Sequence, residues 1–236
     1  MSIPAYLQSA KVADKAIDYK WDIRIQNRIV TTDADRKPAL SKAIGKISAK
    51  AAFAFAVACA EWVTVRLSQH TDVADAMLRL QAAWAATVDL RYARLSKPDV
   101  VDPDNVDPAA DPVYMAMRVL YDAHMRYLAG REDRVYLDAL ILGVLAEHVA
   151  GRNPVFKRWA PEVLKRASQQ HPGSAKKATK EPAVARESFD LDPPDKATLA
   201  ASQANLLAGL NPARNRYLAP AAALRAAGIK DPYPKK

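Results

Sequence analysis

The side chains best placed for acid–base chemistry lie on two helices that the sequence predicts on either side of residues 130–131. So short a connection makes the two helices antiparallel neighbours and sets His124 across from Asp138. With Asp122 on the same helix as His124, these groups could exchange protons with a substrate. A hydrogen-bonded structural pair, or two side chains that face solvent, explains the same spacing. We therefore keep an unfamiliar helical enzyme that uses Asp122, His124 and Asp138 as one alternative.

The motifs of common enzymes are absent from the sequence. Cys59 is the only cysteine and lies in the apolar run 51–60, which favours a buried core thiol over a nucleophile. No serine lies in a Gly-x-Ser-x-Gly motif, and the glycine patterns that cradle phosphates are missing. The four histidines show no metal-ligand spacing. We expect no catalytic site of a common type, no metal and no cofactor.

An acidic stretch at residues 97–112 is the first candidate for contact with a partner. Four prolines in these sixteen residues predict an extended loop without regular structure. Its aspartates resemble calcium ligands, but the central glycine and the final glutamate of an EF-hand loop are missing. Because so long a loop is unusual in a compact domain, we predict that Asp102, Asp104 and Asp107 contact a partner.

Tyrosine and arginine supply the second set of candidate contact residues, because both are enriched at the centres of protein interfaces. One predicted helix has a polar side on which arginine and aspartate recur every four residues, with tyrosines beside them. Its candidate contact residues are Tyr114, Arg118, Tyr121, Asp122 and Arg126. A smaller cluster near the C-terminus adds Arg214, Arg216 and Tyr217.

Nucleic acid is an alternative partner because the chain carries a net charge of +9. The densest basic cluster is formed by Lys176, Lys177 and Lys180, and it contains no aromatic residue for base stacking. No basic recognition helix is evident either. A basic, helical protein that associates with nucleic acid is therefore the second alternative, and its binding would be non-specific.

All the elements that would carry these residues are predicted to be helices. Apolar residues recur at three- and four-residue steps from Tyr6 to Ile25, which predicts one helix over residues 4–30. A second helix is predicted over 38–69. Its alanine–phenylalanine block at 51–60 is apolar on all sides and should be enclosed at the centre of the fold. Alanine accounts for 47 of the 236 residues and favours helix over strand.

Four further predicted helices complete the body, at 71–95, 112–129, 132–149 and 155–170, so that residues 1–170 form an all-α bundle of about six helices. Pro161 is expected to split the last of them. From residue 171 onward prolines become frequent. The composition predicts a flexible linker over 171–194. An arm and tail should follow over 195–236, with two short helices at 195–210 and 220–227.

These features together favour a non-enzymatic protein that binds another protein. The charged N-terminal residues exclude a signal peptide and one cysteine excludes a disulfide framework, so we expect a soluble cytoplasmic protein. The alanine-rich composition is typical of bacteria with high GC content. A toxin-neutralising immunity-type protein or an adaptor of a bacterial system would be a concrete case, acting by steric occlusion. The positive net charge favours an acidic partner, unless the loop at 97–112 makes the contact.

Overall fold

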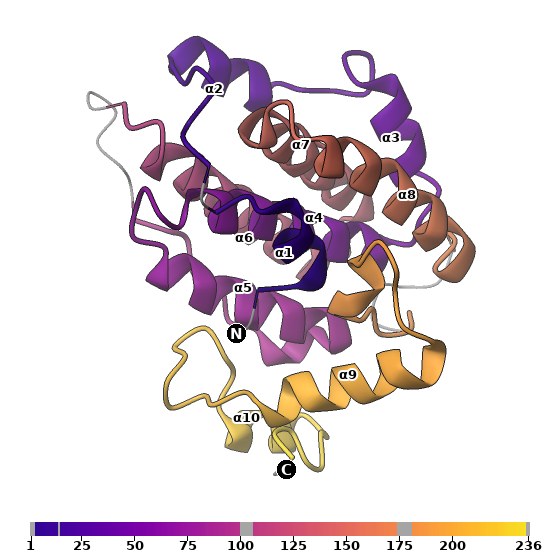
Figure 1. Cartoon of the computed structure of the whole chain (residues 1–236). Coiled ribbons are helices and arrows are strands. Elements are labelled where there is room, and N and C mark those ends of the chain that lie inside the picture. Colours follow the sequence, from indigo (N-terminus) through magenta and orange to yellow (C-terminus); the bar gives the residue numbers. More distant parts are fainter. Residues whose placement is uncertain (1–2, 14, 100–105, 174–180, 235–236) are drawn as a thin grey trace.

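The computed structural model describes every residue except 1–2, 14, 100–105, 174–180 and 235–236. The described residues form ten α-helices and two short 3-10 helices, with no β-strand among them, so the predicted all-α fold is confirmed (Figure 1). No helix in this part of the chain is both long enough and apolar enough to cross a membrane.

The helices follow one another with short connections over most of the chain. In the body they are α1 (Ala5–Ala10), α2 (Ile23–Val30), α3 (Pro38–Ile44), α4 (Ala49–Leu67), α5 (Ala74–Val88), α6 (Ala110–Leu128), α7 (Glu132–Ala150) and α8 (Pro154–Gln170). In the arm they are α9 (Lys196–Ala208) and α10 (Ala221–Ala226). The body thus has two more helices than predicted, because two of the predicted helices are each divided.

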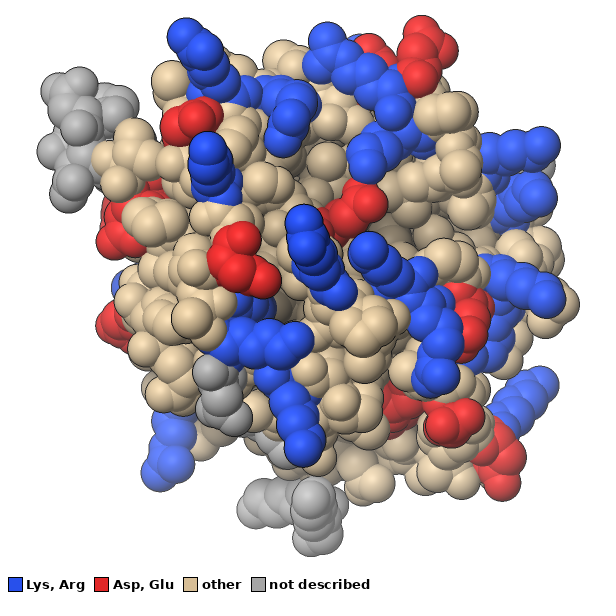
Figure 2. Space-filling view, turned by 45° about the horizontal axis from the view of Figure 1, so that its top comes forward, with Lys and Arg blue, Asp and Glu red and all other residues tan. Residues whose placement is uncertain are grey.

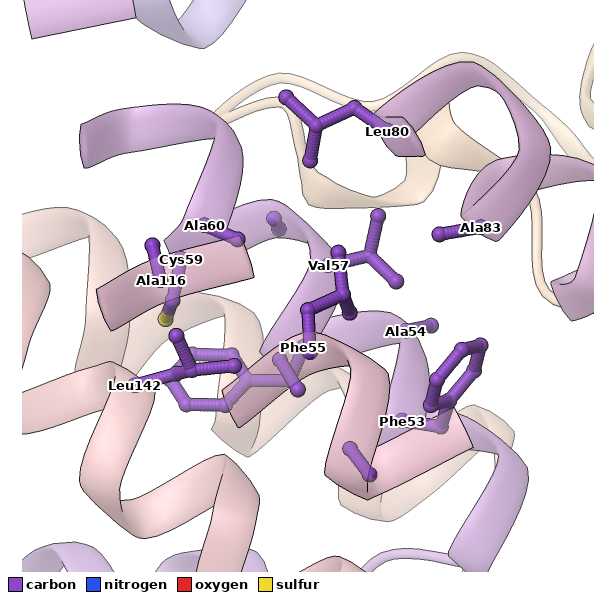
Figure 3. Close-up of a cluster of buried hydrophobic side chains, with 14 of the residues drawn as sticks. Phe53, Ala54, Phe55, Val57, Cys59, Ala60, Leu80, Ala83, Ala116 and Leu142 are labelled. Atoms are coloured by element: carbon purple, nitrogen blue, oxygen red, sulfur yellow. The ribbon is translucent and has the colours of Figure 1, made fainter. Parts of the chain in front are cut away.

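The alanine-rich helix α4 is the centre of the fold, as predicted. All 19 of its residues are buried, and α5, α6 and α7 pack around it (Figure 1). In Figure 3 the larger side chains of α4 lie between its alanines, with Phe55 beside Leu142 of α7 and Val57 on the side of Leu80 of α5. Because alanine adds little bulk, the neighbouring helices come close on every side.

The first predicted helix, over residues 4–30, is wrong as a single element. Lys11 ends α1 in the left-handed conformation with φ of 45°. The carboxylate of Asp22 then begins α2 by accepting a hydrogen bond from the backbone N–H of Ile25 at 2.8 Å. The apolar spacing continues across the gap, which is why the pattern suggested one helix.

A buried arginine explains why the chain between α1 and α2 is not helical. The guanidinium of Arg66, at the end of α4, donates to the carbonyls of Lys15 and Ala16 at 2.7 and 2.5 Å. A ring nitrogen of His70 lies 2.8 Å from the same Lys15 carbonyl. A helix would use these carbonyls for its own backbone, and the buried Arg66 would then lose both of these acceptors.

The second predicted helix is divided too. Residues 45–48 leave the helical path and pair with the chain that follows α8. The N–H of Ser48 donates to the carbonyl of His171 at 2.8 Å, and the N–H of Gly173 donates to that of Lys46 at 2.9 Å. The two paired segments lie far apart in the sequence, so the helical periodicity of either one does not indicate the pairing.

The third predicted helix ends at Val88 and not at Leu95, because the chain after it pairs with the arm. The N–H of Arg94 donates to the carbonyl of Tyr217 at 2.7 Å, and the N–H of Ala219 donates to that of Tyr92 at 2.8 Å. Residues 90–92 form the 3-10 helix η1 before this pairing begins. The arm is therefore joined to the body by backbone hydrogen bonds.

The helices after the acidic loop lie close to where they were predicted. Asn153 caps α8, accepting from the N–H of Val155 at 2.9 Å. The expected split at Pro161 is wrong, because α8 continues through it. Pro161 is exposed, so the carbonyl of Lys157 that loses its helical partner lies on the solvent side of α8.

Part of the segment predicted as a flexible linker packs against the body. Glu181, Val184 and Phe189 are buried, and Phe189 is the last residue of the 3-10 helix η3 (Arg186–Phe189). The indole N–H of Trp159 in α8 donates to the Phe189 carbonyl at 2.7 Å. The composition of this segment did not predict these contacts, because each buried residue stands alone among polar neighbours.

Candidate partner-binding groove

A groove of about 530 Å³ lies between α2, α6 and α7, beside the end of the acidic loop. Helix α6 supplies its longest wall, with Tyr114, Arg118, Asp122 and Arg126 along it. Four of the five residues predicted as a contact face on this helix therefore meet in one hollow. The fifth, Tyr121, is partly buried and packs against the core.

The rim of the groove carries exposed apolar side chains. Ile23 and Val30 stand at the two ends of α2, and Val106 comes from the acidic loop, with exposed fractions of 58%, 43% and 42%. Only six large apolar side chains are this exposed among the described residues, and these three gather at one site. Contiguous exposed apolar surface of this kind marks interaction sites more often than single exposed residues do.

The side of the groove formed by α7 holds a buried carboxylate. Asp138 is only 2% exposed and forms an ion pair with Arg126 through one oxygen, while its other oxygen, Oδ2, is buried without a hydrogen-bond partner. Burial raises the pKa of Asp138 to about 6, although Arg126 acts against this shift.

A second carboxylate in the groove is satisfied on one oxygen only. Asp111, 8% exposed, accepts hydrogen bonds at Oδ2 from Trp21 Nε1 and Gln26 Nε2, at 3.3 and 3.2 Å. Its Oδ1 is buried without a partner. On the wall between, Arg118 and Asp122 form an ion pair at 3.3 Å.

The charges that line the groove sum to −1 when all of them are ionised. Two arginines, Arg118 and Arg126, stand against three carboxylates, those of Asp111, Asp122 and Asp138. The sign is opposite to that of the whole chain, which carries +9. The groove therefore favours a cationic group, and Asp122, 32% exposed, is the carboxylate that such a group could meet.

The acid–base pair considered from the sequence does not form. His124 lies two residues from Asp122 and hence about 200° around the helix, where its ring meets Phe53 of α4 at a centroid distance of 6.1 Å. Burial lowers the pKa of His124 to about 4, and the Leu90 backbone opposes this only partly. No hydrogen bond joins His124 to Asp138, and His124 does not line the groove.

Of the three candidate residues of the acidic loop, Asp107 lies within the described residues. Asp102 and Asp104 lie outside the described residues. Asp107 caps α6, its carboxylate accepting from the N–H groups of Ala109 and Ala110 at 2.7 and 3.0 Å. The loop nevertheless contributes to the groove through Val106, while Asp111, which was predicted in the loop, lies in the first turn of α6.

The C-terminal candidates anchor the arm. Tyr217 is buried, its hydroxyl donates to Asp75 of α5 at 2.7 Å, and the guanidinium of Arg79 lies 4.2 Å above its ring. Arg216 donates to the same carboxylate at 2.7 Å, while Arg214 is exposed. Lys176, Lys177 and Lys180, the densest basic cluster, lie outside the described residues.

The charged side chains on the face of α2, α3 and α7 are mixed in sign. Figure 2 shows lysine and arginine spread across this face with carboxylates among them, and not gathered into one basic patch. Binding to nucleic acid requires basic side chains that follow the phosphate backbone. This face offers no such continuous track.

The most informative residues that the sequence did not single out are Ile23, Val30 and Val106. The sequence pattern gave Ile23 and Val30 no role, because neither belongs to the apolar stripe that was followed along this segment. Within the described part of the chain, no group of three or more His, Cys, Asp or Glu side chains is placed to hold a metal ion. No protein family, curated protein or solved structure matches this chain, so geometry alone identifies the groove as its candidate site.

Proposed function

We propose that this protein is a non-enzymatic binding protein whose groove between α2, α6 and α7 takes a segment of a partner protein. The segment carries apolar side chains and at least one lysine or arginine. One observation supports this proposal above the others: exposed apolar side chains and two incompletely paired buried carboxylates line the same hollow.

The two halves of the groove suggest different contributions to binding. Apolar side chains of the partner would cover Ile23, Val30 and Val106, and burial of apolar surface contributes roughly 25 cal/mol per Å². A cationic side chain would be attracted by the net negative charge of the groove and would meet Asp122, whose side chain is 32% exposed. Because this attraction depends on the sign of the partner's charge, it should contribute to specificity.

The wider role that we propose is that of an immunity-type protein or an adaptor in the cytoplasm of a bacterium. Either would act by occupying the partner's surface and excluding other molecules. A negative groove would suit a basic partner, for example a nuclease toxin, even on a chain that is basic as a whole. The local charge at the contact, and not the net charge of the chain, decides which partner is attracted.

Selection from a library of random 15-residue peptides displayed on phage tests the proposal. We expect the enriched peptides to combine apolar residues with lysine or arginine. Synthetic copies should bind wild-type protein, and Asp122→Lys, which reverses a charge on the groove wall, should weaken them at least 10-fold. Ile23→Ser, which removes an exposed apolar side chain, should weaken them about 3- to 10-fold.

Lys165→Ala is the matched control, since Lys165 is an exposed residue of α8 outside the groove. It should leave the affinity of the peptides unchanged. The proposal fails if the enriched peptides are acidic, or if both groove variants bind them as tightly as the wild type does.

A further inference from the structure

A second hollow, of about 420 Å³, lies between α3, α7 and α8 and shares no lining residue with the groove. We call it the α3–α8 pocket. Its inner surface is apolar and is formed mainly by Leu40, Phe55, Gly143, Phe156, Ala160 and Leu164. Pockets of roughly 300–1,000 Å³ with apolar walls and a few polar groups are typical of small-molecule sites.

Gly143 brings α7 close enough to form the floor of this pocket. A Cβ at this position would lie 3.0 Å from Cδ2 of Leu40 and 3.5 Å from Cε1 of Phe55. The side chains of α3 and α4 therefore rest directly on the backbone of α7. Any larger residue would push Leu40 outward into the space of the pocket.

The rim of the α3–α8 pocket is positively charged. Arg36, Lys37 and Lys157 line it together with one carboxylate, Glu147, so that the rim carries a net charge of +2. Lys37 and Glu147 neutralise each other in an ion pair at 2.7 Å. Arg36 donates to the carbonyl and hydroxyl oxygens of Thr31. These contacts leave the positive charge of Arg36 without a carboxylate.

Lys157 is the cation best placed to meet a ligand. It is exposed, and no hydrogen bond or ion pair joins its ammonium group to the described residues. It lies on the turn of α8 before Pro161, which lacks the N–H that would bond to the Lys157 carbonyl. The pocket thus combines an apolar interior with an unpaired positive charge at its mouth, the opposite of the net negative groove.

We propose that the α3–α8 pocket binds a small amphiphilic carboxylate, such as a medium-chain fatty acid. The hydrocarbon chain lies against Ala39, Leu40 and Ala160, the accessible part of the apolar lining, and the carboxylate meets Lys157 at the rim. A cationic amphiphile is excluded by the rim charge of +2, and a neutral alcohol gains only the apolar contacts. This site is independent of the groove and of the proposed function.

Titration calorimetry of the full-length protein with sodium decanoate tests the proposal. We expect saturable binding with one site per chain, and weaker binding of decanol. Ala160→Phe, which places a ring in the pocket, should weaken decanoate at least 10-fold. Lys157→Ala should weaken it about 2- to 5-fold, as expected for one exposed ion pair. Lys165→Ala, elsewhere on α8, should have no effect.

A second blocking variant separates a filled pocket from a damaged fold. Ala39 lines the pocket from α3 and is exposed, so Ala39→Phe should fold normally and still weaken decanoate. Thermal unfolding confirms that each variant is folded. The proposal is overturned if decanoate shows no saturable binding to the wild type. Affinity that is unchanged in both blocking variants would overturn it too.

Discussion

Arg186 and Glu61, 125 residues apart in the sequence, form a buried ion pair with Nη2 and Oε1 2.5 Å apart. Glu61 lies in the middle of α4, among apolar side chains, and also accepts from the hydroxyl of Tyr6 in α1 at 2.6 Å. One carboxylate therefore joins the N-terminal helix, the central helix and the segment after α8. This explains how residues near 186 can belong to the packed body despite their polar composition.

Replacing Arg186 should destabilise the protein strongly. In Arg186→Met the carboxylate of Glu61 stays buried without its cation, and loss of one partner of a buried pair costs about 3–5 kcal/mol. Adding Glu61→Gln should recover part of this loss, because the amide is neutral and still accepts from Tyr6. Urea unfolding measures both. Arg158→Met, in an exposed pair with Glu162, is the control and should cost less than about 0.5 kcal/mol. Equal effects of Arg186→Met and Arg158→Met would contradict this account.

The close packing around α4 gives a second prediction. Ala54 is fully buried, and Ala54→Leu should cost about 1–3 kcal/mol, because three added carbon atoms must displace neighbouring side chains (Figure 3). Ala204→Leu makes the same change on the exposed face of α9 and should be nearly neutral. Urea unfolding compares the two variants. A stability of Ala54→Leu equal to that of the wild type would show that α4 has room beside it.

The arm should open before the body does, since no residue of α9 is buried and Tyr217 is one of its few deep anchors. Tyr217→Ala removes both the ring under Arg79 and the hydroxyl that binds Asp75. Hydrogen exchange of the Ala219 amide should then become at least 10-fold faster, with exchange of α4 little changed. Arg214→Ala is the control. Faster exchange of α4 to the same extent would mean that arm and body unfold together.

Local patterns in the sequence predicted the helical class and the buried position of α4, because an alanine–phenylalanine block has no polar side to turn outward. They did not predict where the long helices break. Those breaks depend on partners distant in sequence, such as Arg66 for the chain after α1 and His171 for the chain before α4. The backbone of these segments can form either a helix or hydrogen bonds to distant residues. The local sequence shows the tendency to form a helix but not the distant partners.

The sequence predicted which residues of the candidate site share a face of α6, but not which residues of α2 and α7 lie opposite them. Arginine and aspartate four residues apart identified the wall that α6 gives to the groove. Placing Asp138 opposite Arg126, and not against His124, required the rotation of α7 about its axis. Ile23 and Val30 are exposed although Ile29 of the same helix is buried, and the spacing of apolar residues gave no sign of this difference.

Asp138 should make the protein less stable as the pH rises from about 4 to 6. Its pKa in the folded state is raised to about 6 from an ordinary value of 3.8. In this interval the folded state holds a proton that the unfolded state has lost, so stability is highest below pH 4 and falls through pH 6. A shift of this size corresponds to about 3 kcal/mol at most. Asp138→Asn should lack this contribution, and urea unfolding at several pH values measures the difference from the wild type.

His124 should act in the opposite direction over almost the same interval. Burial lowers the pKa of His124 to about 4 from 6.5. Between these pH values the unfolded state binds a proton that the folded state does not bind, so stability falls as the pH drops from 6.5 to 4. The two contributions oppose each other between pH 4 and 6, and the wild type should show little net effect from the pair. His124→Phe should gain stability relative to the wild type on acidification, whereas Asp138→Asn should lose it. Other titrating groups are common to all three proteins and cancel in these differences. Variant curves that run parallel to the wild-type curve would show that neither group titrates abnormally.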